Sequence, residues 1–177
     1  MVIRPARADD FDAIAAITNH YITNTAIHFG YDAVTADELR TAWEQQRDRH
    51  PFLVGEDVPP GTAPGPVLGY AKSGVWRDRA AYQWTAEIGL YVSPNARGRG
   101  LGTALYEELL HELRLRGFRS AVAGITLPNE ASIALHRKFG FDHVGTFADA
   151  GWKLDQWHAV DWWQKRFAYA PERPLPL

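Results

Sequence analysis

A glycine-rich segment offers the clearest chemistry in this sequence. Residues 98–103 read Gly-Arg-Gly-Leu-Gly-Thr and stand between a predicted strand and a strongly amphipathic predicted helix. Free amide groups at a helix start, together with the helix dipole, bind diphosphate groups, and glycine lets the oxygen atoms approach the backbone. The spacing fits neither the dinucleotide fingerprint G-x-G-x-x-G nor the nucleoside-triphosphate loop G-x-x-x-x-G-K-[ST].

A tight strand-to-helix turn without any ligand is the alternative interpretation of this cluster. Arg97 and Arg99 favour ligand binding, because two cations in one loop repel each other unless they share an anion. We therefore expect a diphosphate-binding loop of a different kind from the two nucleotide motifs.

The composition excludes several other kinds of site. The sequence has no cysteine, which removes disulfides, thiolate zinc sites and cysteine nucleophiles. Its seven histidines show neither H-x-x-x-H nor H-E-x-x-H spacing, so we predict no metal site. A net charge of −2 with interspersed charges indicates no nucleic-acid-binding surface and no membrane surface.

The compartment follows from the same features. No stretch approaches the roughly 20 apolar residues that span a bilayer, and the first residues lack the apolar core of a secretory signal. We expect a soluble, cytoplasmic protein.

The elements that position the glycine loop alternate along the chain. Leu105, Leu109 and Leu113 recur every fourth residue and predict the helix that follows the loop. The alternation of strands and helices favours an α/β fold with a mixed sheet, in one domain over residues 1–168 with a tail at 169–177. Strands are predicted at residues 2–4, 51–54, 67–72, 82–92, 121–126, 143–147 and 157–167, helices after Asp10 and at 36–49, 101–116 and 129–139, and an exposed turn at 57–66.

Two motifs together resemble the GNAT superfamily of N-acetyltransferases. The segment Arg97-x-x-Gly100-x-Gly102, directly after a strand, resembles the superfamily's acyl-CoA-binding motif. Residues 129–141 read N-E-A-S-I-A-L-H-R-K-F-G-F and are similar to its N-x-x-[AS]-x-x-L-Y-x-x-x-G-F helix. Both signatures occur in the expected order, and two motifs in order are much more specific evidence than one motif alone.

One departure from that pattern narrows the resemblance. His136 stands where the superfamily usually has the tyrosine that serves as general acid. With residues 76–87, 150–153 and 157–160, this histidine makes the chain similar to phosphinothricin acetyltransferases and to methionine sulfoximine and methionine sulfone acetyltransferases. Relatives often carry a basic residue after the phenylalanine of an early aromatic loop, whereas here Gly30 follows Phe29.

The resemblance implies a fold, a cosubstrate and an assembly. The GNAT fold has a mixed central sheet that splays open between the strand at 87–92 and the strand at 121–126. Acetyl-CoA lies in that opening with its pantetheine arm against the strand backbone, and family members are commonly homodimers. The acceptor is a small amino-acid-like amine.

The resemblance also implies site residues. Glu87 is the expected general base, because an amine attacks a thioester only after it loses a proton. His136 is expected to protonate the leaving thiolate or to hold the substrate. The expected acetyl-CoA-binding residues are Leu90, Tyr91, Val92, Arg97, Gly98, Arg99, Gly100, Leu101, Gly102, Thr103, Asn129 and Ser132. The expected substrate-binding residues are Phe29, Arg77, Arg79, Tyr82 and Thr85.

The same residues are also compatible with purely structural roles, and the sequence is compatible with other functions. Glu87 is also compatible with a solvent-facing strand position, and Arg77 and Arg79 with solvated loop positions. One alternative function is a non-catalytic acyl-CoA sensor. Another is a GNAT enzyme acting on peptide N-termini or on polyamines, although the arginine pair argues against a polyamine pocket.

Overall fold

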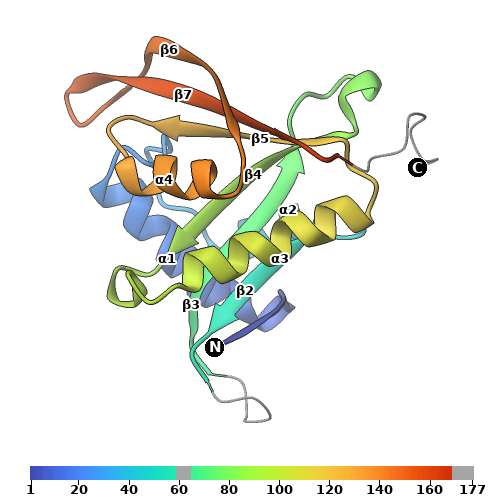
Figure 1. Cartoon of the computed structure of the whole chain (residues 1–177). Helices are drawn as coiled ribbons and strands as arrows, with labels where there is room; N and C mark the ends of the chain where they lie inside the picture. The colour runs from blue at the N-terminus through green and yellow to red at the C-terminus, as the bar shows by residue number, and fades with distance from the viewer. Residues whose placement is uncertain (59–64, 169–177) are drawn as a thin grey trace.

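A single mixed sheet forms the centre of the computed structural model, which describes residues 1–58 and 65–168 (Figure 1). Its seven strands run in the order β1-β2-β3-β4-β5-β7-β6, and among them only β4 and β5 pair in parallel. The strands are β1 (Val2–Pro5), β2 (Phe52–Glu56), β3 (Val67–Val75), β4 (Thr85–Val92), β5 (Ser120–Thr126), β6 (Asp142–Lys153) and β7 (Gln156–Arg166).

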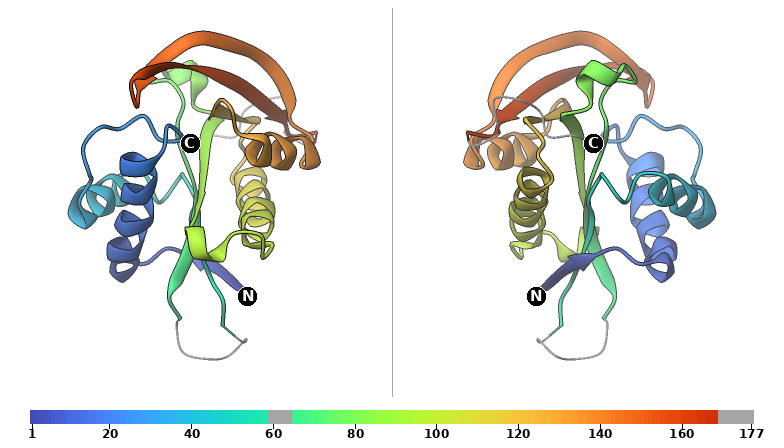
Figure 2. Two further views of the ribbon diagram at one scale, coloured as in Figure 1. Left: turned by 90° about the vertical axis from the view of Figure 1, so that its left-hand side faces the viewer. Right: turned by 90° about the vertical axis from the view of Figure 1, so that its right-hand side faces the viewer.

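Two helices cover each face of the sheet, as Figure 2 shows. On one face lie α1 (Phe11–Asn24) and α2 (Ala36–Glu44), and on the other lie α3 (Leu101–Leu115) and α4 (Glu130–Lys138). Each layer buries its own apolar cluster against the strands, one around Phe11 and Tyr70 and a larger one around Leu105 and Leu109. The β6–β7 hairpin crosses the top of the molecule (Figure 1).

The predicted helix after the glycine loop is α3. Leu105, Leu109 and Leu113 are fully buried against the sheet, as their four-residue spacing predicts. Gly100 is the N-cap of this helix and has a left-handed backbone with φ of +82°. The glycine therefore allows the loop that follows β4 to turn directly into α3.

The splayed sheet expected from the family resemblance is confirmed. Strands β4 and β5 pair over only three residues each, from Thr85 opposite Ser120 to Glu87 opposite Val122. Beyond Glu87, β4 continues to pair only with β3, and β5 only with β7. The sheet therefore opens after the Glu87–Val122 pair, and beyond it the facing edges of β4 and β5 are not paired with each other.

Several predicted boundaries differ from the structure. The strand expected from Tyr82 begins at Thr85, because Ala80–Tyr82 form a short 3-10 helix. The helix expected over 36–49 ends at Glu44, and its last predicted residues form turns instead. The strand expected at 143–147 extends over 142–153 with two irregularities in its register.

Two of the predicted segments fall partly or wholly outside the described residues. The predicted tail at 169–177 and residues 59–64 of the predicted turn lie outside the described residues. Across residues 1–58 and 65–168, we find no helix with the length and apolar character needed to cross a membrane.

Candidate active site

The gap between β4 and β5 opens into a cleft of about 900 Å³. Its walls come from β3, β4 and β5, from the loop before α3, and from residues of all four helices. Both the glycine loop and Glu87 line this cleft. One continuous space thus joins the two features that the sequence singled out.

The glycine loop presents its backbone to this cleft. Gly98 and Gly100 have φ values of +74° and +82°, a conformation that residues with a side chain rarely adopt. A Cβ at either position would meet no atom within 4 Å, so the need for glycine is conformational and not steric. The N-terminal amides of α3, a helix of 15 residues, begin directly after Gly100. This arrangement suits a diphosphate group.

Each arginine of the loop has a partner of its own. Arg97 donates a hydrogen bond to the Tyr21 hydroxyl at 3.1 Å and lies over the Tyr21 ring. Arg99 forms an exposed ion pair with Asp57 and does not line the cleft. The two arginines therefore do not need a shared anion to offset their mutual repulsion. The support for an anion site comes instead from the backbone of the loop.

Glu87 lies where the sheet opens, on the α1 and α2 side. Gly89 and Tyr91 project from the same face of β4 as Glu87, because alternate residues of a strand share a face. The Tyr91 ring packs edge-on against Tyr21 of α1, which places this face on the α1 side. Partial burial raises the pKa of the Glu87 carboxyl, and the positive charges of Arg77 and Lys72 oppose that rise. A carboxylate with a raised pKa is a stronger base than an exposed one.

His136 reaches the cleft from the opposite layer, on α4. It is 5% exposed, and burial lowers the pKa of its imidazole. Its Nδ1 lies 2.7 Å from the Ser132 carbonyl oxygen, so Nδ1 carries the hydrogen and donates it. Its Nε2 accepts a hydrogen bond from the Tyr106 hydroxyl at 2.6 Å. His136 is therefore held as a neutral imidazole whose second nitrogen is engaged by Tyr106.

Most of the residues predicted to bind acetyl-CoA line the cleft together with Glu87 and His136. Asn129 caps α4, and its side chain accepts a hydrogen bond from the Ser132 amide at 3.2 Å. The cleft-lining members of the predicted set are Leu90, Tyr91, Val92, Arg97, Gly98, Gly100, Leu101, Gly102, Thr103, Asn129 and Ser132.

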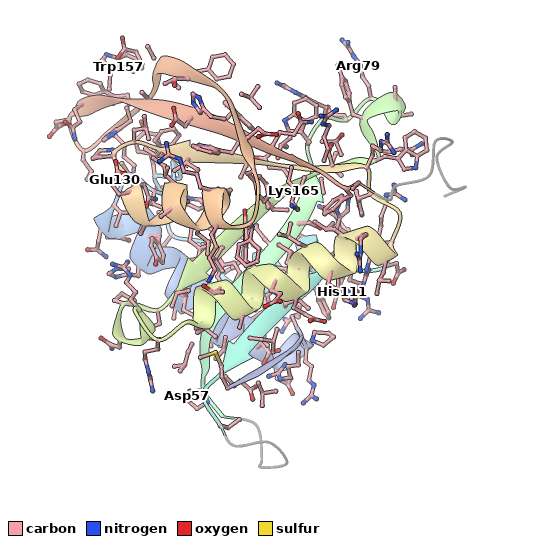
Figure 3. All side chains as sticks on the ribbon, viewed as in Figure 1. Asp57, Arg79, His111, Glu130, Trp157 and Lys165 are labelled. Carbon is pink, nitrogen blue, oxygen red and sulfur yellow. The ribbon has the colours of Figure 1, made fainter. Side chains whose placement is uncertain are left out.

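The five predicted substrate residues do not line the cleft of this chain. Phe29 packs against the His158 ring, and the Thr85 hydroxyl shares a hydrogen bond with Ser120. Arg77, Arg79 and Tyr82 are exposed in the segment before β4, and Arg79 points away from the sheet in Figure 3. Of these five, Arg77 acts on the site through its charge near Glu87.

Two residues that line the cleft, Lys72 and Tyr106, were not among the predicted site residues. Lys72 is a single charge within the largely apolar strand β3, and it lines the cleft near Glu87. Tyr106 is one residue away from the leucine stripe of α3 and is only 1% exposed. A charged residue inside an apolar strand is a signal that the sequence does carry. The pairing of Tyr106 with His136 depends on two helices far apart in the chain.

Lys153 is a third unpredicted feature, beside the cleft. Its side chain is buried, and Nζ donates to the carbonyls of Ile22 and His28 at 2.5 Å each. The hydroxyl of Tyr31 donates to the Trp152 carbonyl close by. These bonds fasten the loop after α1 to the β6–β7 hairpin.

Over the two described stretches of the chain, no group of three or more His, Cys, Asp or Glu side chains is arranged to hold a metal ion.

The comparison with known proteins decides the family. Residues 15–141 match the model of the acetyltransferase (GNAT) family. The chain is a GNAT acetyltransferase. It is 41% identical to the phosphinothricin N-acetyltransferase of Streptomyces viridochromogenes over 98% of this chain and 92% of that one. It is 38% identical to the L-methionine sulfoximine/L-methionine sulfone acetyltransferase of Pseudomonas aeruginosa over 88% of each chain.

A solved structure agrees with these relatives. The GNAT acetyltransferase described here resembles a phosphinothricin acetyltransferase from Sinorhizobium meliloti that was crystallised in complex with AcCoA. The TM-score is 0.91 with 30% sequence identity, and the match covers 98% of this chain and 92% of that one. The predicted fold and family are therefore confirmed.

Proposed function

We propose that this GNAT acetyltransferase moves the acetyl group of acetyl-CoA to the amino group of a small amino-acid analogue, such as phosphinothricin, methionine sulfoximine or methionine sulfone. The observation that carries the proposal is the continuous cleft, which joins the glycine loop to Glu87 through the opening between β4 and β5. The names of the similar proteins support this class of acceptor.

The glycine loop and the two inner strand edges suit acetyl-CoA. The α3 amides and the backbone of residues 98–103 would hold the diphosphate, with Arg97 beside them. Beyond Glu87, β4 makes no further pairs with β5, so its inner edge offers backbone groups to the pantetheine amides. Asn129 and Ser132 border the same space from α4.

Glu87 is the proposed base. It takes a proton from the substrate ammonium, directly or through a water molecule, and the neutral amine then attacks the thioester carbonyl. The carbon–nitrogen bond forms, the carbon–sulfur bond breaks, and the nitrogen loses its second proton to the departing thiolate, so that coenzyme A leaves as the thiol. Backbone amides of residues 90–92 are the proposed donors to the carbonyl oxygen as it gains charge.

His136 and Tyr106 are proposed to serve the sulfur end of the reaction. Because Nδ1 of His136 is committed to the Ser132 carbonyl, only Nε2 is able to exchange a proton, and Nε2 faces the Tyr106 hydroxyl. Burial raises the pKa of the Tyr106 hydroxyl well above its ordinary value, so this hydroxyl stays protonated. The pair therefore forms a neutral polar wall of the cleft beside the sulfur, and the proton of the thiol comes from the attacking nitrogen. The lowered pKa of His136 argues against a resting imidazolium.

Phe29, Arg77, Arg79, Tyr82 and Thr85 remain proposed substrate contacts. They stand outside the cleft of one chain, so a direct contact requires the substrate or a second subunit to extend the site toward them.

A homodimer is part of the proposal, supported by exposed apolar side chains on the β6–β7 hairpin. Trp152 and Trp157 pack edge to face and are 46% and 58% exposed. Figure 3 shows Trp157 at the outer margin of the molecule. The other exposed apolar residues of this hairpin are Val144, Phe147 and Leu154. Exposed apolar groups concentrated on one element indicate an interaction surface.

A screen for thiol release tests the proposed function. The purified protein is incubated with acetyl-CoA and a panel of phosphinothricin, methionine sulfoximine, methionine sulfone, polyamines and peptides. We expect thiol release with the amino-acid analogues and an acetylated product in the mass spectrum. Tight acetyl-CoA binding without turnover on any amine would instead identify a sensor. Activity confined to peptides or polyamines would overturn the proposed acceptor.

A further inference from the structure

Lys72, Gly74, Glu87 and Gly89 form a patch on one face of the β3–β4 pair, with the two charged side chains placed diagonally across the two glycines. In the β3–β4 pair, Lys72 lies opposite Gly89, and Gly74 lies opposite Glu87. Residues directly opposite each other, or two apart on one strand, project from the same face of a sheet, so all four share one face. The two glycines carry no side chain. Space therefore remains above the sheet between the ammonium of Lys72 and the carboxylate of Glu87.

The space above this floor is open to a ligand. A Cβ at Gly74 would come no closer than 3.6 Å to its nearest neighbour, the Gln46 amide oxygen. A Cβ at Gly89 would approach the Tyr91 ring at 3.5 Å, an ordinary contact distance. All four residues line the main cleft. The patch is thus part of the cleft floor and not a filled region of the core.

Among residues 1–58 and 65–168, the ammonium of Lys72 forms no hydrogen bond and no ion pair, in contrast to Arg4, Arg99 and Lys153, which all have oxygen partners. Glu87 and Lys72 act on each other through their charges alone, without contact within ion-pair distance. Burial lowers the pKa of His28 in the loop after α1, and the charge of Lys72 adds to that lowering. A cation in a cleft without a partner favours an anionic ligand group.

We propose that Lys72 binds the α-carboxylate of the acceptor while Glu87 receives its amine, so that the site selects zwitterionic α-amino acids over simple amines. The inference rests on the proposed function and deepens it by naming the group that is recognised. An α-amino acid carries its ammonium and its carboxylate on one carbon, so its two charges are opposite in sign to those of Glu87 and Lys72, which share this face of the sheet.

This assignment differs from the arginines of the segment before β4. Arg79 is exposed and outside the cleft, and Arg77 lies over the Trp76 ring. Lys72 therefore supplies the anion-binding charge within a single chain. Its charge also repels cationic acceptors, which disfavours polyamines at the same position.

Two matched acceptors test the inference, namely methionine sulfone and the amine that remains when its carboxylate is removed. Wild-type protein is expected to acetylate methionine sulfone with the lower KM. In Lys72→Met, the KM for methionine sulfone should rise by roughly tenfold to a hundredfold, as expected when one charged hydrogen bond is lost. The KM for the decarboxylated amine should stay within about twofold. Lys72→Arg should keep the preference for the amino acid.

Control measurements separate recognition from folding. Arg114→Met removes one exposed positive charge of α3 and should leave both KM values unchanged. Thermal melting and calorimetric binding of acetyl-CoA report whether Lys72→Met is folded, and Lys72→Gln provides a polar second variant if the methionine variant is unstable.

The outcomes distinguish this inference from the proposed function. If wild-type protein acetylates both acceptors equally well, or if Lys72→Met weakens both to the same degree, the role of Lys72 is overturned while the acetyltransferase function stands. If wild-type protein acetylates neither these acceptors nor the other amino-acid analogues, the proposed function fails and the inference fails with it.

Discussion

The two ends of the cleft are built in different ways. The proposed acetyl-CoA end is formed mainly by one continuous stretch, from β4 through the glycine loop into α3, and it offers backbone groups. The proposed acceptor end is formed by side chains from separate segments, namely Glu87 on β4, Lys72 on β3 and the loop after α1 that Lys153 holds. Substitutions at the first end should therefore act through chain conformation, and those at the second through individual charges and hydrogen bonds.

The largest expected effect concerns Glu87. Glu87→Gln removes the proposed base, so kcat should fall by roughly 10²- to 10⁴-fold, whereas the Kd for acetyl-CoA should not change. A base acts only when deprotonated. Because the pKa of Glu87 is raised, the kcat/KM of the wild-type protein should fall with decreasing pH at a pH above the ordinary range of a glutamate carboxyl.

Steady-state kinetics over pH, together with calorimetry, check this prediction. In whatever activity Glu87→Gln retains, the inflection that belongs to Glu87 should be absent, and the rate should instead rise with pH toward the pKa of the substrate ammonium. Full activity in the variant would remove Glu87 from the mechanism.

Two lysine side chains that donate to backbone carbonyls sharpen the comparison between the two ends. Lys153 holds the acceptor loop, and Lys165, labelled in Figure 3, donates to the Phe139 carbonyl at 2.6 Å where α4 ends. Lys153→Met should raise the KM of the amine by about tenfold, and Lys165→Met should instead weaken acetyl-CoA binding. Lys153→Met removes the donor to two carbonyls and Lys165→Met the donor to one, and each substitution should lower the free energy of unfolding by about 1–3 kcal/mol for each carbonyl left without a donor.

Kinetics with each substrate varied in turn, and denaturant unfolding, distinguish the two variants. If both lysine variants change the same kinetic constant, the two ends of the cleft are not independent.

The glycines of the loop should respond according to their conformation. Gly100→Ala places a side chain at φ of +82°, which should cost about 1–2 kcal/mol of stability and weaken acetyl-CoA binding by roughly tenfold. Gly102→Ala is the matched comparison, because it lies within α3 and its Cβ would meet Leu90 at an ordinary 3.4 Å. That variant should keep its thermal stability. Equal losses of stability in both variants would contradict the conformational explanation.

The smallest expected effect concerns Tyr106. Tyr106→Phe removes the donor to Nε2 of His136 and keeps the ring in the core. The loss of one hydrogen bond is worth about 1 kcal/mol net, so kcat should fall by about fivefold with acetyl-CoA affinity retained. Stopped-flow measurement of thiol release would check this value. An unchanged kcat would restrict the Tyr106–His136 pair to a structural role.

The sequence carried enough information for the acetyl-CoA end. The closely spaced glycines, the leucine period of α3 and the residue order of α4 are local patterns, and a local pattern determines local backbone geometry. The expected splay between β4 and β5 came from the family resemblance and is confirmed. By contrast, the partners of Arg97 and Arg99 could not be predicted, because Tyr21 and Asp57 are 76 and 42 residues away in the chain.

The acceptor end was decided by the tertiary structure. The position of Lys72 beside Glu87 depends on the register between β3 and β4, and a slip of one residue would send Lys72 to the other face. The contacts of Lys153 join residues that are 131 and 125 apart in sequence. Sequence alone determined the order and type of the main elements and the conformation of the glycine loop, because this geometry is encoded within a few neighbouring residues. Only the folded chain decided which charges meet, because such pairs form where strands and loops distant in sequence pack together.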